Sequence, residues 1–282
     1  MARALKQSAR QAVVGGWGVL RLFLLRHGET EFSRNDRFCG DIDAALTLAG
    51  ARMGRLFADA YAALPWRAII TSTRRRAVAT AQPLAERLAL PIAQDRRLDE
   101  MYFGDWQGLT KHEAAARDPE HYTRWRNDPT IGAPSGESPF DASVRAASVI
   151  DDLRGRYDSG DVLVVSHKTV LRLLLCHLVN IDLRLYRECV DWPTGAVTVL
   201  ELGRGPAIPR ALCLADERHL FPQPARHFVS EQDAGWGELE IDVVDDQPAG
   251  ADSALDFEIT ADDGVDPMTG AVGGAVDPGG GP

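Results

Sequence analysis

Two apolar segments that each end in a histidine constrain the fold of this chain more than any other feature. Segment 22–25 runs directly into Arg26 and His27, and segment 162–166 runs into His167. Short apolar runs bounded by turn signals are typical of strands buried on both faces of a parallel sheet. Such sheets bind ligands just beyond the carboxyl ends of their strands. The two histidines therefore indicate a ligand site at one sheet edge, and the arginine favours an anion.

The rest of the chain alternates between strand-like and helix-like segments. This alternation predicts an α/β fold with three layers, α/β/α, and a mostly parallel central sheet. Further strands are expected at about 68–71, 91–93, 196–202 and 211–214. Helices are expected at about 46–64, with Thr47 as N-cap, and at 111–117, 119–127 and 140–157.

A third strand-to-helix junction carries three consecutive arginines, Arg74, Arg75 and Arg76. The first turn of a helix presents free backbone N–H groups and a partial positive charge, which favour an anion. An arginine there adds a cation that can bind an oxyanion through two hydrogen bonds. The small residue Ala77 favours Arg76 as the inward-facing arginine and leaves the other two as surface charges.

Two segments are predicted as loops that carry polar groups to the same edge. Segment 98–108 interleaves acids, aromatics and glycines, and either Asp99 or Glu100 could act as a general acid or simply be a solvated or capping acid. Segment 31–45 is also expected to be a loop. After the first strand, Gly28 would let the backbone approach a ligand closely.

The acidity of the chain is concentrated at its carboxyl end. Of the 41 acidic residues, 14 lie at 231–282, which contains no Lys or Arg; the other 27 face 31 basic residues, so the rest carries +4. Nothing in this distribution favours a nucleic-acid partner. Three regions are predicted: a basic, flexible extension at 1–18, one domain at 19–230, and a disordered acidic tail at 231–282 that could contact a protein partner.

Composition also limits the type of protein. No segment approaches the ~20 apolar residues of a membrane span, so no membrane association is expected. The four cysteines show no CxxC spacing, which is typical of reduced thiols in a cytoplasmic protein. The seven histidines show no HExxH spacing, so no metal site is expected. A homodimer remains an open alternative to a monomer.

Four motifs occur in an order that resembles one known family. The motifs 25–30, 76–81, 100–108 and 165–167 resemble the histidine phosphatase superfamily, in its phosphoglycerate-mutase-like branch, and the resemblance covers about residues 20–202. The resemblance implies a phosphohistidine mechanism that uses no metal and no other cofactor. It implies that His27 is the nucleophile, that Arg26, Arg76 and His167 bind the phosphoryl oxygens, and that Glu100 donates a proton.

The chain departs from the family pattern at two positions. Ser33 stands where many members have an asparagine that contacts phosphate, and could donate one hydrogen bond in its place. Lys168 stands where many members have glycine after the second histidine, and either adds a cation to the rim or faces solvent. Thr30 is expected to contact phosphate beside Gly28.

The substrate should be a small phosphomonoester. Arg34 and Arg37 could hold an additional acidic group on it, or could be surface charges. The short section 108–134 favours a phosphatase over a cofactor-dependent phosphoglycerate mutase, and segments 37–40 and 125–128 resemble broad-specificity and α-ribazole-phosphate phosphatases. A third alternative is a non-catalytic member that binds a phosphorylated partner, although all five expected catalytic positions are filled.

Overall fold

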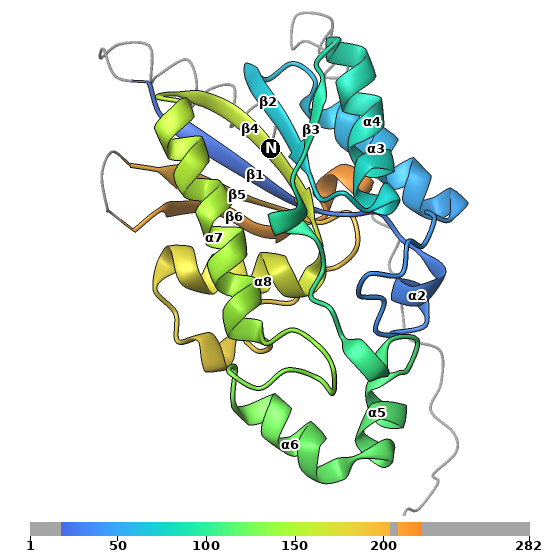
Figure 1. Ribbon diagram of the computed structural model, residues 1–282. Coiled ribbons are helices and arrows are strands. Elements are labelled where there is room, and N and C mark those ends of the chain that lie inside the picture. The colour runs from blue at the N-terminus through green and yellow to red at the C-terminus, as the bar shows by residue number, and fades with distance from the viewer. Residues whose placement is uncertain (1–17, 204–207, 222–282) are drawn as a thin grey trace, which may run out of the picture. The chain divides into compact units, whose positions relative to one another are not determined.

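A computed structural model describes residues 18–203 and 208–221 of this chain (Figure 1). The predicted tail at 231–282, and all of the predicted extension except Gly18, lie outside the described residues. The described part contains a six-stranded sheet with the strand order β3-β2-β4-β1-β5-β6. The strands are β1 (Leu20–Arg26), β2 (Trp66–Thr71), β3 (Ile92–Gln94), β4 (Gly160–Ser166), β5 (Val197–Leu202) and β6 (Arg210–Asp216).

The sheet is mostly parallel, as predicted. Strands β3, β2, β4 and β1 run parallel to one another, whereas β5 is antiparallel to β1 and β6 is antiparallel to β5. Helices α3 (Leu48–Tyr61) and α4 (Arg75–Leu88) pack on one face, and α7 (Pro139–Arg156) and α8 (Lys168–Val179) pack on the other (Figure 1). The predicted three-layer α/β/α architecture is confirmed.

Burial on both faces explains the continuous apolar run of β1. Leu22 and Leu24 belong to the core cluster under α7 and α8, whereas Phe23 and Leu25 belong to the cluster under α3 and α4. All four side chains are fully buried. A central strand covered on both sides needs apolar residues at every position, because successive side chains point to opposite faces.

A buried ion pair sets the register between the two strands that end in histidine. Arg21 on β1 lies opposite Asp161 on β4, and its Nε and Nη2 donate to the two carboxylate oxygens at 2.6 and 2.8 Å. A one-residue slip would separate the pair and turn every side chain to the wrong face. The same register places Arg26 opposite Ser166, the last residues of the two strands. His27 and His167, which follow them, therefore lie at the same edge of the sheet.

The helices largely match the expectations from sequence. The Thr47 hydroxyl accepts from the Gly50 N–H at 3.0 Å and caps α3 as predicted. One prediction is wrong: segment 31–45 is not all loop, because Thr30 and Ser33 form a capping box that starts the short helix α2 (Glu31–Arg34). The described part also contains four short 3₁₀ helices: η2 (Arg96–Leu98), η3 (Gly104–Trp106), η4 (Leu183–Leu185) and η5 (Arg218–Leu220).

Two helices form a cap beyond the carboxyl ends of the strands. Helices α5 (Lys111–Arg117) and α6 (Pro119–Asn127) have the bounds that the sequence predicts, and lie below the sheet in Figure 1. Aromatic side chains hold the cap together, with Phe38, Phe103, Trp106 and Trp125 in one buried cluster. This cluster forms a wall beside the sheet edge where the ligand site is expected.

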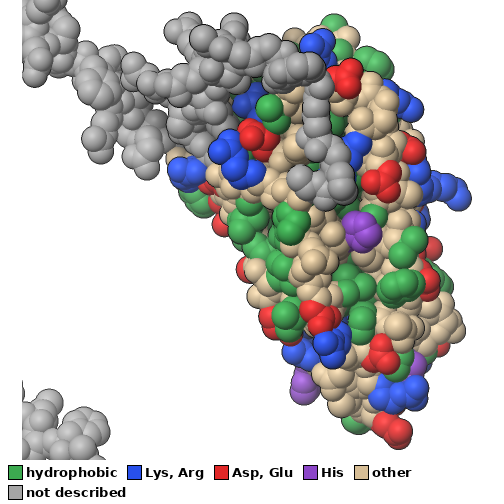
Figure 2. Space-filling view, turned by 90° about the vertical axis from the view of Figure 1, so that its left-hand side faces the viewer, with side chains coloured by type: hydrophobic (Ala, Val, Ile, Leu, Met, Phe, Trp, Pro, Cys, Tyr) green, Lys and Arg blue, Asp and Glu red, His purple; other side chains and the backbone are tan. Residues whose placement is uncertain are grey.

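One face of the described part is chemically mixed. This face carries acidic and basic side chains among hydrophobic ones (Figure 2). No helix among the described residues is both long and apolar enough to span a bilayer.

Candidate active site

The sheet brings the two predicted histidines together. The N–H of His27, just after β1, donates to the carbonyl of Ser166 at the end of β4, at 3.0 Å. The ring centroids of His27 and His167 lie 5.1 Å apart. Strands that are 140 residues apart in sequence therefore deliver both imidazoles to one place, because they are neighbours in the sheet.

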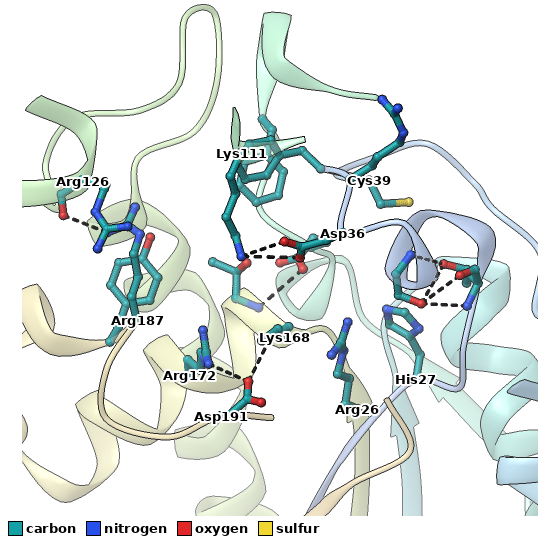
Figure 3. Close-up of a pocket in the computed structure, with 18 of the residues that line it drawn as sticks. Arg26, His27, Asp36, Cys39, Lys111, Arg126, Lys168, Arg172, Arg187 and Asp191 are labelled. Carbon is teal, nitrogen blue, oxygen red and sulfur yellow. Dashed lines mark hydrogen bonds and ion pairs between the residues drawn. The ribbon is translucent and has the colours of Figure 1, made fainter. Parts of the chain in front are cut away.

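A cavity of about 410 Å³ opens between this sheet edge and the cap (Figure 3). Four of the five predicted catalytic residues line it: Arg26, His27, Arg76 and Glu100. The fifth, His167, is fully buried and does not line the cavity.

His27 is held as a neutral ring with one nitrogen fixed. A carbonyl can only accept a hydrogen bond, so the 2.7 Å contact between His27 Nδ1 and the Gly28 oxygen places the proton on Nδ1. Nε2 is then the nitrogen with a free electron pair. Burial lowers the pKa of His27 well below 6.5, and the charges of Arg76 and Arg26 lower it further. The ring is therefore neutral near neutral pH, with its single proton on Nδ1.

Gly28 has a packing role that the sequence did not predict. It is not among the residues that line the cavity. A Cβ at Gly28 would lie 2.3 Å from the carbonyl oxygen of Gly50 on α3. The glycine instead allows α3 to pack closely against the turn whose carbonyl orients His27.

Two guanidinium groups flank the nucleophile candidate. Arg76 is the inward arginine, as predicted: it is fully buried, and its Nη1 and Nη2 donate to the carbonyls of Ile42 and Gly40 at 2.7 and 2.9 Å. Arg26 Nη1 donates to the Trp192 carbonyl at 2.7 Å. The Nε of Arg26 is buried without a hydrogen-bond partner in the described part of the chain. Burial lowers the pKa of the Arg26 guanidinium to about 10.

His167 belongs to a chain of hydrogen bonds behind the arginine. Arg76 Nε donates to His167 Nδ1 at 3.2 Å, so the ring proton is on Nε2, which donates to Ser72 Oγ at 2.7 Å. Ser72 in turn donates to Asp99 at 2.8 Å. Both nitrogens of His167 are thus engaged within the protein in this structure.

The geometry separates the two candidate acids. Asp99 accepts from Ser72 and Thr73 and pairs with Arg74 at 3.3 Å, and it does not line the cavity. Glu100 does line the cavity, and its Oε1 accepts from the Met101 N–H at 2.9 Å. Burial raises the pKa of Glu100 although nearby hydrogen bonds and arginines lower it, so its protonated form is favoured more than usual.

Most of the predicted substrate-binding residues line the cavity, but not all of them do. Thr30, Ser33, Arg37 and Lys168 all line the cavity. The Ser33 hydroxyl accepts from the Thr30 N–H at 2.8 Å, so it serves the α2 cap. Arg34 is not part of the lining.

The charged members of this group already have partners. Arg37 pairs with Glu113 at 2.9 Å, and Arg34 pairs with Glu29 at 2.7 Å, outside the cavity. Lys168 Nζ lies 2.8 Å from Asp191. No group of three or more His, Cys, Asp or Glu side chains in the described ranges is placed to hold a metal ion.

Comparison with known proteins agrees with this geometry. A model of the histidine phosphatase superfamily (branch 1) matches residues 22–212. The chain belongs to the histidine phosphatase superfamily. The match covers both histidines, the inward arginine and the cavity carboxyl group.

Relatives of this chain include named enzymes. A bifunctional protein of Mycobacterium tuberculosis is 41% identical over 156 residues, which are 55% of this chain and 43% of that protein. The chain thus spans less than half of that relative's length. Glucosyl-3-phosphoglycerate phosphatase of Mycobacterium tuberculosis is 32% identical over 61% of this chain and 78% of its own. Adenosylcobalamin/alpha-ribazole phosphatase of Escherichia coli is 30% identical over 57% of this chain and 80% of its own.

Solved structures of the same fold support the assignment. Bacillus stearothermophilus YhfR superposes with a TM-score of 0.66 at 30% identity, over 71% of this chain and 99% of that one. A mycobacterial glucosyl-3-phosphoglycerate phosphatase in complex with VO3 gives a TM-score of 0.64 at 27% identity, over 70% of this chain and 99% of its own.

Several residues of the candidate site were not predicted from the sequence. Ser72 follows β2 directly, so the rule that strand ends carry function could have identified it. Arg172, Arg187 and Asp191 line the cavity but lie on α8 or in the irregular segment after it. They carry no motif, and only the fold shows that they face the site.

Proposed function

We propose that this chain hydrolyses a small phosphomonoester through a phosphohistidine formed on His27. The observation that carries the proposal is the fixed tautomer of His27, whose Nδ1–H donates to the Gly28 carbonyl and leaves the Nε2 electron pair free. Arg26, Arg76 and Glu100 line the same cavity. Phosphoryl transfer needs mainly positioning and neutralisation of oxygen charge, which two guanidinium groups supply.

In the first step the Nε2 electron pair of His27 forms a bond to phosphorus. The bond between phosphorus and the ester oxygen breaks, and its electrons stay on that oxygen. Glu100, whose pKa is raised by burial, gives its proton to the departing oxygen, so the product is an alcohol. Arg26 and Arg76 hold the phosphoryl oxygens. His167 joins them if its Nε2–H exchanges its bond to Ser72 for one to phosphate.

In the second step water replaces the alcohol. The Glu100 carboxylate removes a proton from water as the water oxygen bonds to phosphorus. The bond between phosphorus and His27 Nε2 breaks. Inorganic phosphate leaves and both residues return to their starting forms. A mutase would instead pass the phosphoryl group to a second hydroxyl. The names of the relatives, which are phosphatases for small phosphorylated metabolites, support hydrolysis.

A panel of small phosphomonoesters tests the proposal. Phosphate release is measured with EDTA present, beside a mutase assay on 3-phosphoglycerate. We expect hydrolysis of several esters, unaffected by EDTA, because the proposed charges come from side chains. Activity that needs added metal would contradict the mechanism. Isomerisation of 3-phosphoglycerate that exceeds phosphate release would favour the mutase.

His27→Ala tests the nucleophile separately. We expect it to abolish turnover and the acid-labile phosphoryl group that can be trapped on the wild-type enzyme. Circular dichroism checks that the fold is retained. A well-folded His27→Ala variant with wild-type turnover would exclude His27 as the nucleophile. Binding of phosphate to wild-type protein without any turnover would favour the non-catalytic alternative.

A further inference from the structure

The cavity carries more positive charge than one phosphate needs. Eight Lys or Arg side chains and four Asp or Glu side chains line it. Three of these cations each have a carboxylate of their own in an exposed pair, namely Arg37–Glu113, Lys111–Asp36 and Arg126–Glu188. Once Arg26 and Arg76 are assigned to the phosphoryl group, three cations remain: Lys168, Arg172 and Arg187.

Two of the remaining cations share a single carboxylate. Lys168 and Arg172 stand one helical turn apart on α8, where side chains lie side by side. Lys168 Nζ and Arg172 Nη2 lie 2.8 and 3.1 Å from the same oxygen of Asp191. Among the described residues, Asp191 is the only carboxylate within ion-pair distance of either. The Asp191 side chain is 74% exposed, whereas that of Arg172 is only 14% exposed.

Arg172 retains hydrogen-bonding capacity inside the protein. Its Nε is buried and makes no hydrogen bond within the described part of the chain. A buried donor without a partner is costly, and an anionic oxygen that reached it would remove that cost. Burial is the main cause of the lowered pKa of Arg26, and the charge of Arg172 contributes to it, so the two guanidinium groups lie close enough to interact.

The location of this pair suits one end of a substrate. Lys168, Arg172 and Asp191 lie between Arg26 on one side and Arg187 on the other (Figure 3). Arg187 is held in place because its guanidinium lies 4.0 Å from the Trp125 ring and 4.2 Å from the Tyr186 ring. A phosphoryl group at His27 would therefore have its remaining atoms extending past Lys168 and Arg172.

We propose that Lys168 and Arg172 form a subsite for a second anionic group of the substrate, and that Asp191 occupies this subsite as an internal counter-ion when no substrate is bound. The substrate class is then a phosphomonoester that bears a carboxylate or a second phosphate. This inference rests on the proposed function, because it extends the site at which His27 acts. A purely structural role, in which the three residues only join α8 to the following segment, is the alternative.

Matched pairs of esters measure the subsite directly. The carboxylate arm compares 3-phosphoglycerate with glycerol 3-phosphate, which has a hydroxymethyl group in place of the carboxylate. The second-phosphate arm compares propane-1,3-diol bisphosphate with the corresponding monophosphate. We expect kcat/KM to favour the doubly anionic ester at least about tenfold in one arm, since hydrogen bonds between charged groups are among the strong ones. The arm that responds identifies the second group.

Four variants separate a subsite from a structural pair. Lys168→Met and Arg172→Met should each reduce that preference about tenfold, mainly through KM. Asp191→Asn should increase it, because it removes the competing charge but keeps the oxygen that accepts from the Trp192 N–H at 2.9 Å. Lys111→Met is the matched control: Lys111 also lines the cavity but pairs with Asp36, so the preference should stay as in the wild type.

The outcomes distinguish this inference from the proposed function. Hydrolysis of simple esters with no preference in either arm would overturn the subsite and leave the phosphatase intact. A preference that survives both methionine variants would also overturn it. If no ester is hydrolysed, the proposed function fails. The subsite is then tested by thermal stabilisation, which compares the doubly anionic ester with its singly anionic partner in each arm, and equal stabilisation in both arms would overturn it.

Discussion

Burial sets the protonation states of the proposed nucleophile and the proposed proton donor. His27 must be neutral to attack, and Glu100 must be protonated to release the alcohol. Loss of hydration disfavours the charged form of both, so the pKa of His27 falls and that of Glu100 rises. The positive charges of Arg76 and Arg26 lower the pKa of His27 further. On Glu100 the same charges oppose the rise in pKa that burial causes. Burial in one cavity therefore prepares both a neutral nucleophile and a protonated acid.

Glu100→Gln tests the acid. We expect kcat/KM on an alkyl phosphomonoester, which reports the first step alone, to fall about 10²–10⁴-fold, because an alkoxide leaves poorly without a proton. The loss on p-nitrophenyl phosphate should be much smaller, since its phenolate leaves without help. In the wild type, the rate on the alkyl ester should decline at acid pH as His27 protonates and at alkaline pH as Glu100 ionises.

Steady-state kinetics across pH check this prediction. The glutamine variant should lose the alkaline decline and keep the acidic one. Glu113→Gln is the control, since Glu113 is exposed and pairs with Arg37 at the cavity rim. Equal losses on both esters would argue against a proton donor at Glu100.

At the scale of elements, a tight turn connects the site to the cap. Gly104 begins η3 and has φ of +49°, and a Cβ there would lie 2.0 Å from the Pro134 carbonyl oxygen. Its neighbours Phe103 and Trp106 are buried in the cap cluster. The turn therefore fixes the wall of the cavity through both backbone conformation and close packing.

Alanine substitution should separate these two contributions. Gly108 also has positive φ, at +83°, but a Cβ there would meet nothing within 4 Å. Gly108→Ala should reduce the free energy of unfolding by about 1–2 kcal/mol, the backbone cost alone. Gly104→Ala adds overlap with backbone and should cost about 3 kcal/mol or more. Urea denaturation measures both, and equal losses would show that the overlap is relieved.

At the scale of the whole molecule, buried neutral histidines make stability depend on pH. Burial lowers the pKa of His27 and His167 well below 6.5, and that of His219 to about 4. The unfolded chain then binds more protons than the folded chain below about pH 6.5. Stability is therefore complete above that pH and decreases as pH falls. The raised pKa of Glu100 acts in the opposite direction, because the folded chain keeps that proton longer.

Urea denaturation between about pH 7.5 and 5.5 tests this sign. Each buried histidine should cost about 1.4 kcal/mol per pH unit below its unfolded pKa. His219→Leu removes one such group outside the cavity, where the ring packs edge-on against Phe57 and Tyr61. Per pH unit of acidification, the free energy of unfolding of the variant should fall by about 1.4 kcal/mol less than that of the wild type. An identical pH dependence would show that His219 does not titrate on unfolding.

Local pattern was sufficient for much of the fold and the outline of the site. The apolar run before Arg26 and His27 predicted a central strand because burial on both faces leaves no polar position. Thr47 was identifiable as a cap from its hydroxyl, and Arg76 as the inward arginine from the small residue after it. These features depend on neighbours in sequence, so the sequence by itself determined them.

Tertiary structure decided what depends on contacts between distant segments. The pairing of Arg21 with Asp161 sets the register that places His27 beside His167, and it joins residues 140 positions apart. Asp99 and Glu100 are adjacent in sequence, and only packing shows that Asp99 supports Ser72 while Glu100 faces the cavity. Burial, which sets the pKa of both His27 and Glu100, exists only once the layers are assembled, so no local pattern could reveal it.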